Sequence, residues 1–546
     1  MNDNLDQKIE FIPSEKFARL AKTPIAYFSS EYALDNSDDQ FAGGLGVLAG
    51  DMVLQASEDG LPFIAIGLKY GDKIPGGFEV LSCDNEPVLI PVPIKKKNVF
   101  AKIWVKKFGD SAYVFLLDSD VDKNSLEDRK ITFCLYDPDL YMRLSQQMVM
   151  GIGGARLIRS LSINPSIFHI NEGHAAFAAL AVIAEEAHAK SEPFSSIKEL
   201  LKNKLVATKH TIFSEAGMYI DKKDFFDFLE LYASEEKIDL EGVFSIGQYE
   251  KDHNIFSTMR FALYSVGRRS GVSITHTLFE KERHPESFLL PITNGVSKSR
   301  WTSLLWNGLS VLDMKVAEIW KIKNALRKEL ILFTNAVAGT KLNKDTCTVV
   351  WARRLALYKR PMAIFSNISR LTDLCSSKTP VQFIISGKAH SADEEGQKIE
   401  DDIRILAEDP SFNGKIAFVP GYSIEVAKKL TAGADIWLNT PERGKEACGT
   451  SGMKAGLNGG LVMSVSDGWV DEIDWKGAGW ILPNKDISNA IYDFLEMESL
   501  PEFYSRNNEG APEAWVNKMR ATMEIVGSRY GAERMLSDYI SKLYQI

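Results

Sequence analysis

The sequence predicts an α/β protein with two lobes, each built on a parallel, Rossmann-like sheet. Short apolar runs alternate with helical patterns along most of the chain. Glycine-rich or polar turns follow several of these runs, at the strand ends where parallel sheets place ligands. The length of 546 residues exceeds what one compact core accommodates. We therefore expect a first lobe over residues 1–310 and a second over residues 311–546.

Composition narrows the functional classes. The chain has 64 basic and 73 acidic residues, a formal net charge of -9, and 45% hydrophobic residues, which is typical of a soluble globular protein. The negative balance argues against a nucleic-acid surface. The polar N-terminus lacks a signal peptide, and the longest apolar run, near residues 175–184, is too short to span a bilayer. Five scattered cysteines indicate no disulfide framework and no metal site, so we expect a cytoplasmic protein.

The first lobe begins with a βαβ unit. Apolar runs at residues 25–29 and 63–68 predict buried strands, and the glycine-rich turn at residues 42–50 lies between them. Helical spacing follows the turn, so its glycines open a helix N-terminus that can face an anion. Turns of this kind also occur for packing alone. Two extended segments joined by Gly109 and Asp110 then predict an antiparallel hairpin insertion near residues 95–120.

Three later strands of this lobe end in polar residues. The strand at residues 167–170 leads to His174, the strand from residue 205 leads to His210, and the strand from residue 291 leads to Asn294. These positions are typical of ligand contacts in α/β folds. A neutral imidazole can accept a hydrogen bond from a hydroxyl. His174 could equally belong to a helix cap.

The second lobe starts after a charged, helical stretch and carries a basic loop. A strand at residues 346–351 is followed by Arg353, Arg354, Lys359 and Arg360, four cations in eight residues. A loop that leaves a strand and enters a helix is suited to clamping a dianion. A solvated basic loop is the alternative.

A strand at residues 435–439 then places the segment EACGTSGMKAGLN, residues 446–458, at its end. Glycine, threonine and serine before Lys454 predict a tight turn that leads into a helix. The apolar neighbours Met453, Ala455 and Leu457 could shelter the amine and lower its pKa enough to condense with an aldehyde. An isolated motif of this length would more often be an ordinary surface lysine.

The segment around Lys454 resembles the pyridoxal-phosphate signature of the α-glucan phosphorylases, the glycogen, starch and maltodextrin phosphorylases, in which the lysine holds the cofactor as a Schiff base. The basic loop is similar to the phosphate clamp of the same family. Matches follow in order from about Tyr27 to Glu472. The resemblance implies a pyridoxal-phosphate-dependent glycosyltransferase with two lobes facing across a cleft, the glycosyltransferase B fold. A terminal helix could cross back onto the first lobe.

The resemblance also implies a role for each site residue. Arg353 would face the cofactor phosphate, Arg354 and Lys359 would hold inorganic phosphate, and His210 would bond to the 6-hydroxyl of the glucosyl unit. The implied catalytic residues are Lys359, Arg354 and His210. The implied cofactor contacts are Lys454, Arg353, Gly44, Tyr422, Thr450 and Ser451. The implied substrate contacts are Leu45, Asn294, Tyr358, Glu446, Cys448, Gly449 and His174. Cys448 stands where many members have serine.

The implied reaction is reversible phosphorolysis of the terminal α-1,4-linked glucosyl unit to α-glucose 1-phosphate, with the 5'-phosphate of the cofactor as proton relay. The partners would be an α-1,4-glucan and inorganic phosphate, and homodimers are usual in the family. The short chain argues against allosteric control. A nucleotide-sugar glucan synthase and a catalytically inactive glucan-binding relative remain alternatives, and neither needs Lys454. The preferred glucan length stays open.

Overall fold

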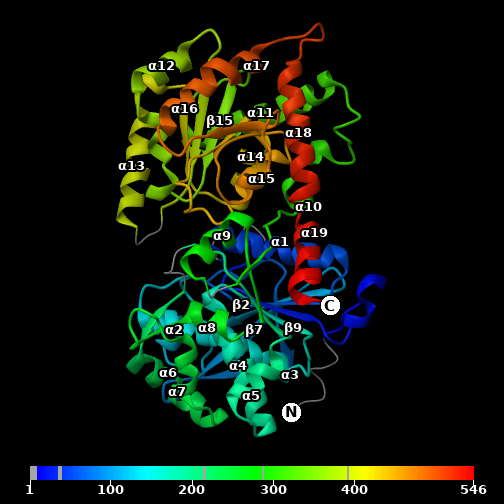
Figure 1. The fold of residues 1–546 in the computed structure, drawn as a ribbon, viewed down its shortest axis with the longest axis vertical. Helices are drawn as coiled ribbons and strands as arrows, with labels where there is room; N and C mark the ends of the chain where they lie inside the picture. Colours follow the sequence, from blue (N-terminus) through cyan, green and yellow to red (C-terminus); the bar gives the residue numbers. More distant parts are fainter. Residues whose placement is uncertain (1–8, 35–39, 213–216, 286–287, 390–392) are drawn as a thin grey trace. The chain divides into compact units, whose positions relative to one another are not determined.

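The chain folds, in a computed structural model, into two compact units (Figure 1). The structure describes residues 9–34, 40–212, 217–285, 288–389 and 393–546, so the N-terminal residues 1–8 lie outside it. The first unit comprises residues 1–272, 277–292 and 535–546, and the second comprises residues 273–276 and 293–534. The division falls before residue 310, because residues 293–303 form hydrogen bonds with Glu472, Tyr530 and Asn458 of the second unit.

The first unit contains a sheet with the strand order β14-β13-β10-β9-β1-β2-β8-β7-β3. Its central strands β1, β2, β9 and β10 are parallel, with Ile25 opposite both Phe63 and Ile167. The predicted strands are confirmed here, because their continuous apolar runs are buried on both faces. The strands are β1 (Ile25–Phe28), β2 (Phe63–Leu68), β3 (Glu79–Val80), β4 (Ser82–Cys83), β5 (Glu86–Pro87), β6 (Leu89–Ile94), β7 (Lys97–Phe108), β8 (Ala112–Asp118), β9 (Ile167–Asn171), β10 (Leu205–Thr208), β11 (Tyr219–Asp221), β12 (Ile255–Ser257), β13 (Arg268–Gly271) and β14 (Leu290–Pro291).

The predicted hairpin is present as β7 and β8, which pair antiparallel. Strand β8 also pairs in parallel with β2, from Phe63 opposite Ala112 to Leu68 opposite Leu117. All seven residues of β8 are buried. The hairpin therefore extends the main sheet, since an apolar strand of this kind needs cover on both faces.

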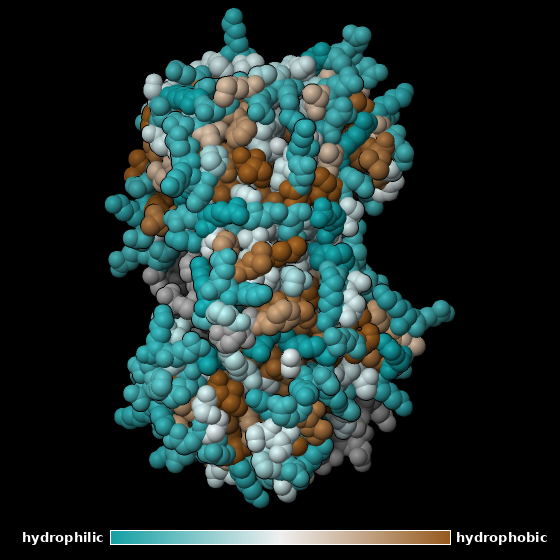
Figure 2. Space-filling model, in the orientation of Figure 1, coloured by the Kyte–Doolittle hydropathy of each residue, from teal (hydrophilic) through white to brown (hydrophobic). Residues whose placement is uncertain are grey.

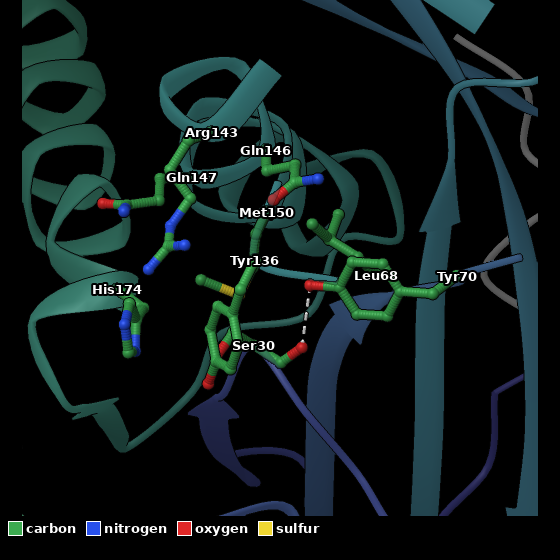
Figure 3. Close-up of a pocket in the computed structure, with 9 residues that line it drawn as sticks. All are labelled: Ser30, Leu68, Tyr70, Tyr136, Arg143, Gln146, Gln147, Met150 and His174. Carbon is green, nitrogen blue, oxygen red and sulfur yellow. Dashed lines mark hydrogen bonds between the residues drawn. The ribbon is translucent and has the colours of Figure 1, made fainter. Parts of the chain in front are cut away.

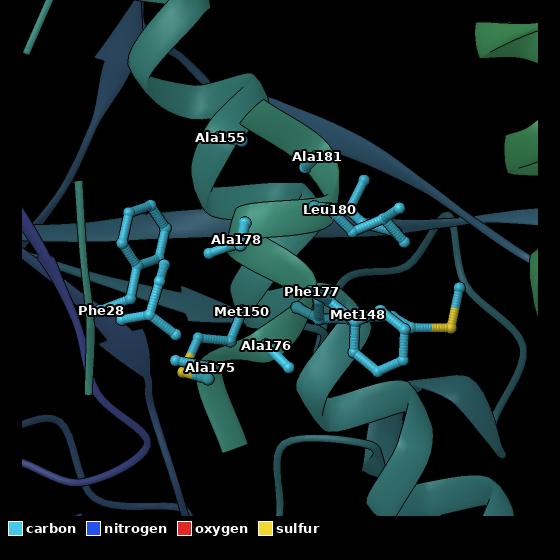
Figure 4. Packing of buried hydrophobic residues seen from close by; sticks show 14 of the residues in the cluster. Phe28, Met148, Met150, Ala155, Ala175, Ala176, Phe177, Ala178, Leu180 and Ala181 are labelled. Atoms are coloured by element: carbon cyan, nitrogen blue, oxygen red, sulfur yellow. The ribbon is translucent and has the colours of Figure 1, made fainter. Parts of the chain in front are cut away.

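Helices cover this sheet, and one close approach depends on small residues (Figure 4). Helix α4, rich in alanine, packs against the π-helix η5 (Val149–Gly153). A Cβ on Gly151 would lie 2.5 Å from the backbone of Phe177 and Ala178, so only glycine allows this approach. The helices are α1 (Gly44–Asp59), α2 (Leu140–Met148), α3 (Gly154–Ser160), α4 (Ala176–Lys190), α5 (Phe194–Leu201), α6 (Lys222–Glu236), α7 (Leu240–Gly247) and α8 (Thr258–Tyr264). Helices α9 (Ile274–Arg283) and α19 (Ala532–Asp538) include residues of both units.

The second unit contains a six-stranded parallel sheet with the order β17-β16-β15-β18-β19-β20. Val349 and Trp351 pack into one apolar cluster, and Val350 and Ala352 pack into another on the opposite face. The strands are β15 (Cys347–Ala352), β16 (Val381–Ser386), β17 (Ile416–Val419), β18 (Ile436–Asn439), β19 (Leu461–Val465) and β20 (Gly479–Leu482). The helices are α10 (Lys298–Trp301), α11 (Val316–Ala338), α12 (Ile368–Ser376), α13 (Glu394–Glu408), α14 (Ile424–Gly433), α15 (Ser451–Gly456), α16 (Ile487–Phe494), α17 (Leu500–Tyr504) and α18 (Glu513–Arg529).

Both units are mixed α/β with parallel strands, which confirms the predicted fold class. Hydrophilic residues cover most of the face shown in Figure 2, where hydrophobic residues form scattered patches. Within the described ranges, no helix combines the length and the apolar character that crossing a membrane requires.

Candidate active site

Two neighbouring parallel strands of the second unit deliver the main charged residues to one edge of the sheet. Strand β15 ends at Ala352 and is followed directly by Arg353, while β18 ends at Asn439 and leads into the loop that carries Glu446. The two strands pair in parallel, with Val349 opposite Ile436. Their carboxyl ends therefore meet, which brings together residues that lie far apart in the sequence.

Glu446 is the centre of a buried ion cluster. Its Oε2 lies 2.7 Å from Lys359 Nζ and 3.0 Å from Arg353 Nη2. The side chains of Arg353, Lys359 and Glu446 are 6%, 9% and 15% exposed, respectively. Burial alone would raise the pKa of Glu446, but the charges of Arg353, Lys359 and Arg354 lower it to about 2. Glu446 is thus an anion at neutral pH among three cations.

The basic loop differs locally from the prediction of a loop entering an α-helix. It forms a 3-10 turn over Leu357–Lys359, after which Arg360 adopts a left-handed conformation with φ 48° before Pro361. Arg354 Nη2 donates to Tyr358 Oη over 3.2 Å. The guanidinium of Arg360 instead donates to the carbonyl oxygens of Thr440, Pro441 and Asn484. Arg360 therefore anchors the loop, and the other three cations face the site.

Lys454 lies on the short helix α15 and is 5% exposed, so the predicted apolar shelter is present. Its Nζ lies 3.9 Å from the centroid of the Trp301 ring. The turn before it is held by Thr450, whose carbonyl oxygen accepts from Lys454 N, and by Ser451, whose Oγ lies 3.2 Å from Trp437 Nε1. The structure thus presents a buried amine against an aromatic face.

Unsatisfied polar atoms lie next to this lysine turn. Among the described residues, Arg353 Nη1 and Asn439 Oδ1 are buried without a hydrogen-bond partner. A Cβ on Gly449 would lie 2.6 Å from Arg353 Nη2 and 2.9 Å from Glu446 Oε1, so any larger residue there would displace the charged ends of this ion pair. Burial raises the pKa of Tyr422 to about 12, against the opposing charge of Arg353, so this phenol is neutral at physiological pH. Buried polar atoms are usually hydrogen-bonded, so these two atoms, Arg353 Nη1 and Asn439 Oδ1, are candidates for contact with a polar ligand.

Cys448 and Asn294 lie near each other in the second unit. Burial raises the pKa of the Cys448 thiol, while hydrogen bonds with the backbone of Asn294 and Trp469 oppose the shift. The thiol is therefore protonated at neutral pH. Within the described part of the chain, Asn294 Oδ1 is buried and lacks a partner.

Asp467 is a site residue that the sequence did not point to. Its carboxylate accepts from the backbone N–H groups of Gly444, Glu446 and Gly468, over 2.8, 3.0 and 2.9 Å. Burial raises its pKa to about 6, against these hydrogen bonds. Asp467 fixes the loop that carries Glu446. Its only sequence signal is an Asp-Gly turn after the apolar run of β19.

In the first unit, His210 is oriented by its neighbours. His210 Nε2 lies 2.6 Å from Asn171 Oδ1, and Asn171 Nδ2 donates to Ser29 Oγ. The backbone N–H of His210 donates to Glu172 Oε2 over 2.6 Å. Burial lowers the pKa of His210 to about 3, so the ring is neutral. Because a carboxamide oxygen only accepts, Nε2 carries the proton and Nδ1 is left as an acceptor.

His174 lines a small pocket of the first unit (Figure 3). Burial lowers its pKa to about 3, and the charge of Arg143 acts in the same direction. Among the described residues, both amide atoms of Gln147 and the Nδ1 of His174 are buried without partners. The Arg143 guanidinium lies 4.7 Å from the centroid of the Tyr136 ring. The pocket has a volume of about 10 Å³, which is room for about one water molecule and too little for a sugar. The lining residues are Ser30, Leu68, Tyr70, Tyr136, Arg143, Gln146, Gln147, Met150 and His174.

The glycine turn of the first unit is held by a carboxylate of the protein itself. Glu31 Oε2 accepts from Ala42 N over 2.8 Å and from Gly43 N over 3.2 Å, while its Oε1 accepts from Tyr136 Oη. These two amides are therefore already engaged, which the glycine pattern did not indicate. Gly44 begins α1, with Leu45 next to it, and a Cβ on Gly44 would meet nothing within 4 Å. Packing thus does not explain Gly44.

The predicted site residues fall into two groups. The structure brings Arg353, Arg354, Lys359 and Glu446 together in the second unit, and His210 and His174 lie near each other in the first. The remaining second-unit residues are Asn294, Tyr358, Tyr422, Cys448, Gly449, Thr450, Ser451 and Lys454, and the remaining first-unit residues are Gly44 and Leu45. No cluster of three metal-ligating side chains occurs in the ranges that the structure describes.

The fold and the cationic cluster beside a buried lysine define a two-unit α/β protein of the glycosyltransferase B type. The sequence model of the family described as carbohydrate phosphorylase matches residues 310–476. Glycogen phosphorylase of Mycobacterium bovis is 31% identical, over 96% of this chain and 71% of that protein. Glycogen phosphorylase of Aquifex aeolicus is 30% identical, over 97% of this chain and 87% of that protein. Maltodextrin phosphorylase of Thermococcus litoralis is 30% identical, over 95% of this chain and 70% of that protein. The chain belongs to the carbohydrate phosphorylase family and is an enzyme of the glycosyltransferase type.

Proposed function

We propose that the protein is an α-glucan phosphorylase that splits terminal α-1,4-linked glucosyl units with inorganic phosphate and releases α-glucose 1-phosphate. The observation that carries the proposal is the cluster of Arg353, Arg354 and Lys359 around a single carboxylate, next to the Lys454 turn. Three cations facing one anion leave a net positive site, and a phosphate dianion would balance it. The names of the relatives support the same reaction.

The residues around Lys454 fit pyridoxal phosphate. The buried amine would hold the aldehyde end, and the unsatisfied Nη1 of Arg353 would donate to the phosphate end. Thr450, Ser451 and Tyr422 of the second unit are the further proposed contacts. When bound, this cofactor supplies a phosphate group that can exchange a proton with a substrate phosphate.

Arg354 and Lys359 would hold the substrate phosphate and stabilise positive charge that develops on the sugar. Lys359 Nζ is already fixed by Glu446 at 2.7 Å, so it would need little reorganisation on binding. Glu446, Gly449, Cys448, Asn294 and Tyr358 are the proposed sugar contacts of this unit. The neutral thiol of Cys448 can donate only weakly, so its backbone is the stronger candidate for a sugar contact.

In the first unit, His210 would accept a hydrogen bond from a sugar hydroxyl through Nδ1. Its neutral state follows from the pKa of about 3, and the bond from Nε2 to Asn171 fixes the tautomer. His174 and Leu45 are the proposed further contacts.

The test has two parts: the first examines whether Lys454 binds the cofactor, and the second examines the reaction. Either part can give a negative result without the other. Borohydride reduction of protein incubated with pyridoxal phosphate, followed by peptide mass mapping, is expected to modify Lys454. The loaded protein is then given maltodextrin with inorganic phosphate or, in parallel, a nucleotide sugar with maltodextrin. Release of α-glucose 1-phosphate only with phosphate supports the proposal. Chain extension from the nucleotide sugar without any glucose 1-phosphate would overturn it in favour of a glucan synthase.

A further inference from the structure

The side chain of Asn458 connects two segments of the second unit. Asn458 is fully buried and lies four residues after Lys454. Its Nδ2 donates to the carbonyl oxygen of Lys454 over 2.9 Å and to that of Trp301 over 2.8 Å. Its Oδ1 accepts from the backbone N–H of Ser303 over 2.8 Å. One carboxamide thus ties residues 301–303 to the helix that carries Lys454.

This tie contributes to the placement of the Trp301 indole. Trp301 is the last residue of α10, and its N–H donates to Ser297 O over 3.1 Å within that helix. The hydrogen bonds at Trp301 O and Ser303 N fix the chain on both sides of Thr302. The indole is 2% exposed and covers Lys454 Nζ at 3.9 Å from the ring centroid. A cation at this distance from an indole face is attracted by it.

Lys323 of α11 fixes Asn458 from the opposite side. It is fully buried, and its Nζ donates to the carbonyl oxygens of Asn458 and Ala432, each over 3.1 Å. A buried lysine is costly unless its donors are satisfied, and here two carbonyl oxygens accept from two of its three N–H groups. The backbone of Asn458 is therefore anchored independently of its side chain.

We propose that Asn458 is a positioning residue for Lys454: by holding residues 301–303 against α15, it keeps the Trp301 indole over the Lys454 amine and limits the approach of electrophiles to that amine. The identity of the aldehyde that Lys454 takes rests on the proposed function. The shielding itself does not depend on it.

A purely structural asparagine would behave differently. The loss of such an asparagine would lower the stability of the unit, but it would not raise the labelling of Lys454 more than that of other lysines. Any rise in Lys454 labelling would also add to the rise caused by removing the Trp301 indole. If Asn458 acts through Trp301, the two substitutions are instead coupled, and the double variant resembles either single one.

The experiment is competitive labelling of the protein's amines with trace acetic anhydride, followed by peptide mass mapping. The variants are Asn458→Leu, Trp301→Leu and the double variant. Relative to the exposed Lys445, labelling of Lys454 is expected to rise at least ~5-fold in each, the effect of losing a desolvated cation–π contact. The double variant is expected to show no further rise. An unchanged Lys454 in Asn458→Leu, or additive rises in the double variant, would overturn the proposal.

Thr522→Val is the matched control. Thr522 is fully buried on α18, packs against Gly456 of α15, and donates to the carbonyl oxygen of Ala478. Its loss also removes a buried hydrogen bond beside α15, but it leaves the Asn458 contacts intact. Labelling of Lys454 is expected to stay at the wild-type level. An equal rise in Thr522→Val would show that general loosening causes the effect, and would contradict the proposal.

A second variant covers the case in which Asn458→Leu does not fold. Ser303 has φ -61° and ψ 142°, angles that proline adopts, so Ser303→Pro causes no backbone strain. The substitution removes the N–H group that donates to Asn458 Oδ1. The same rise in Lys454 labelling is expected, and no rise would count against the proposal. Pyridoxal phosphate capture is measured in parallel. Wild-type protein that captures none at Lys454 would contradict the proposed cofactor, while the labelling result still decides the role of Asn458.

Discussion

Replacing Glu446 with glutamine is expected to destabilise the second unit in a pH-dependent way. The pKa of Glu446 is about 2, below the ordinary value of 4.5, because Arg353, Lys359 and Arg354 favour its charged form over the cost of burial. A lowered carboxyl pKa stabilises the folded state above the unfolded pKa, and this stabilisation is lost as the pH falls through the folded pKa. The shift of roughly 2.5 units corresponds to about 3 kcal/mol at pH 7.

The same linkage fixes the profile between neutral and acid pH. The difference in the free energy of unfolding between wild type and Glu446→Gln is expected to stay near 3 kcal/mol above about pH 5, and to fall steadily as the pH drops below about 4.5 towards the folded pKa of about 2. Urea unfolding followed by tryptophan fluorescence measures it, since every tryptophan except Trp104 belongs to the second unit.

The matched control is Glu442→Gln on the same loop, where a partly exposed carboxylate pairs with Lys445. Exposed pairs contribute little, so a change within about 0.5 kcal/mol is expected. A Glu446→Gln variant as stable as this control, or a difference that does not narrow below pH 4.5, would refute the assignment of Glu446 as the buried counter-ion of the cluster.

Three further predictions concern single side chains. Lys359→Ala is expected to lower the turnover of α-glucose 1-phosphate formation at least ~10²-fold, because it removes a preorganised cation. Lys445→Ala, on the loop that carries Glu446, should leave the turnover unchanged, and wild-type turnover in Lys359→Ala would refute the assignment. Burial lowers the pKa of Lys323 to about 7, so the unfolded state binds more protons above that pH. The free energy of unfolding should then rise between pH 7 and pH 10 by up to ~1.4 kcal/mol per pH unit, and Lys323→Met should remove that slope in urea titrations. Burial also raises the pKa of Cys448, so iodoacetamide at pH 8 should modify the exposed Cys134 well before it; equal rates would contradict the buried thiol.

The sequence was most informative where a strand is buried on both faces. The strands β1, β2, β15 and β16 could be predicted from their own apolar runs, without knowing which strands they pair with. A short, continuous apolar run is typical of a strand that is buried on both faces. Strand β13, with the sequence RRSG, has no apolar pattern, and its place in the sheet comes from pairing with β10. Tertiary pairing of this kind leaves no local signal.

The candidate site was predictable in part, for a similar reason. Motif and strand-end position located Arg353, Lys359 and Lys454, and the structure shows all three buried in one unit. The ion pairs of Glu446 with Arg353 and Lys359 were not anticipated, because they join two loops that only the parallel pairing of β15 and β18 brings together.

The residues that hold the site in place were missed. Trp301, Asp467 and Asn458 act through backbone groups or ring faces of distant segments, and no local spacing encodes such contacts. They became recognisable only when the distances between segments were known. The boundary near residue 310 was predicted from a charged, helical stretch without strand signals. Hydrogen bonds to Glu472 and Asn458 instead place residues 293–303 in the second unit.

The most direct test of the proposed reaction is a phosphorus-31 NMR time course of the pyridoxal-phosphate-loaded protein with maltoheptaose and inorganic phosphate. We expect a growing α-glucose 1-phosphate signal at the expense of inorganic phosphate. We expect no such signal in Lys454→Ala protein treated in the same way. If wild-type protein carrying the cofactor on Lys454 left the inorganic phosphate signal unchanged, the proposed phosphorolysis would be contradicted, and a catalytically inactive glucan-binding member of the family would be the better description.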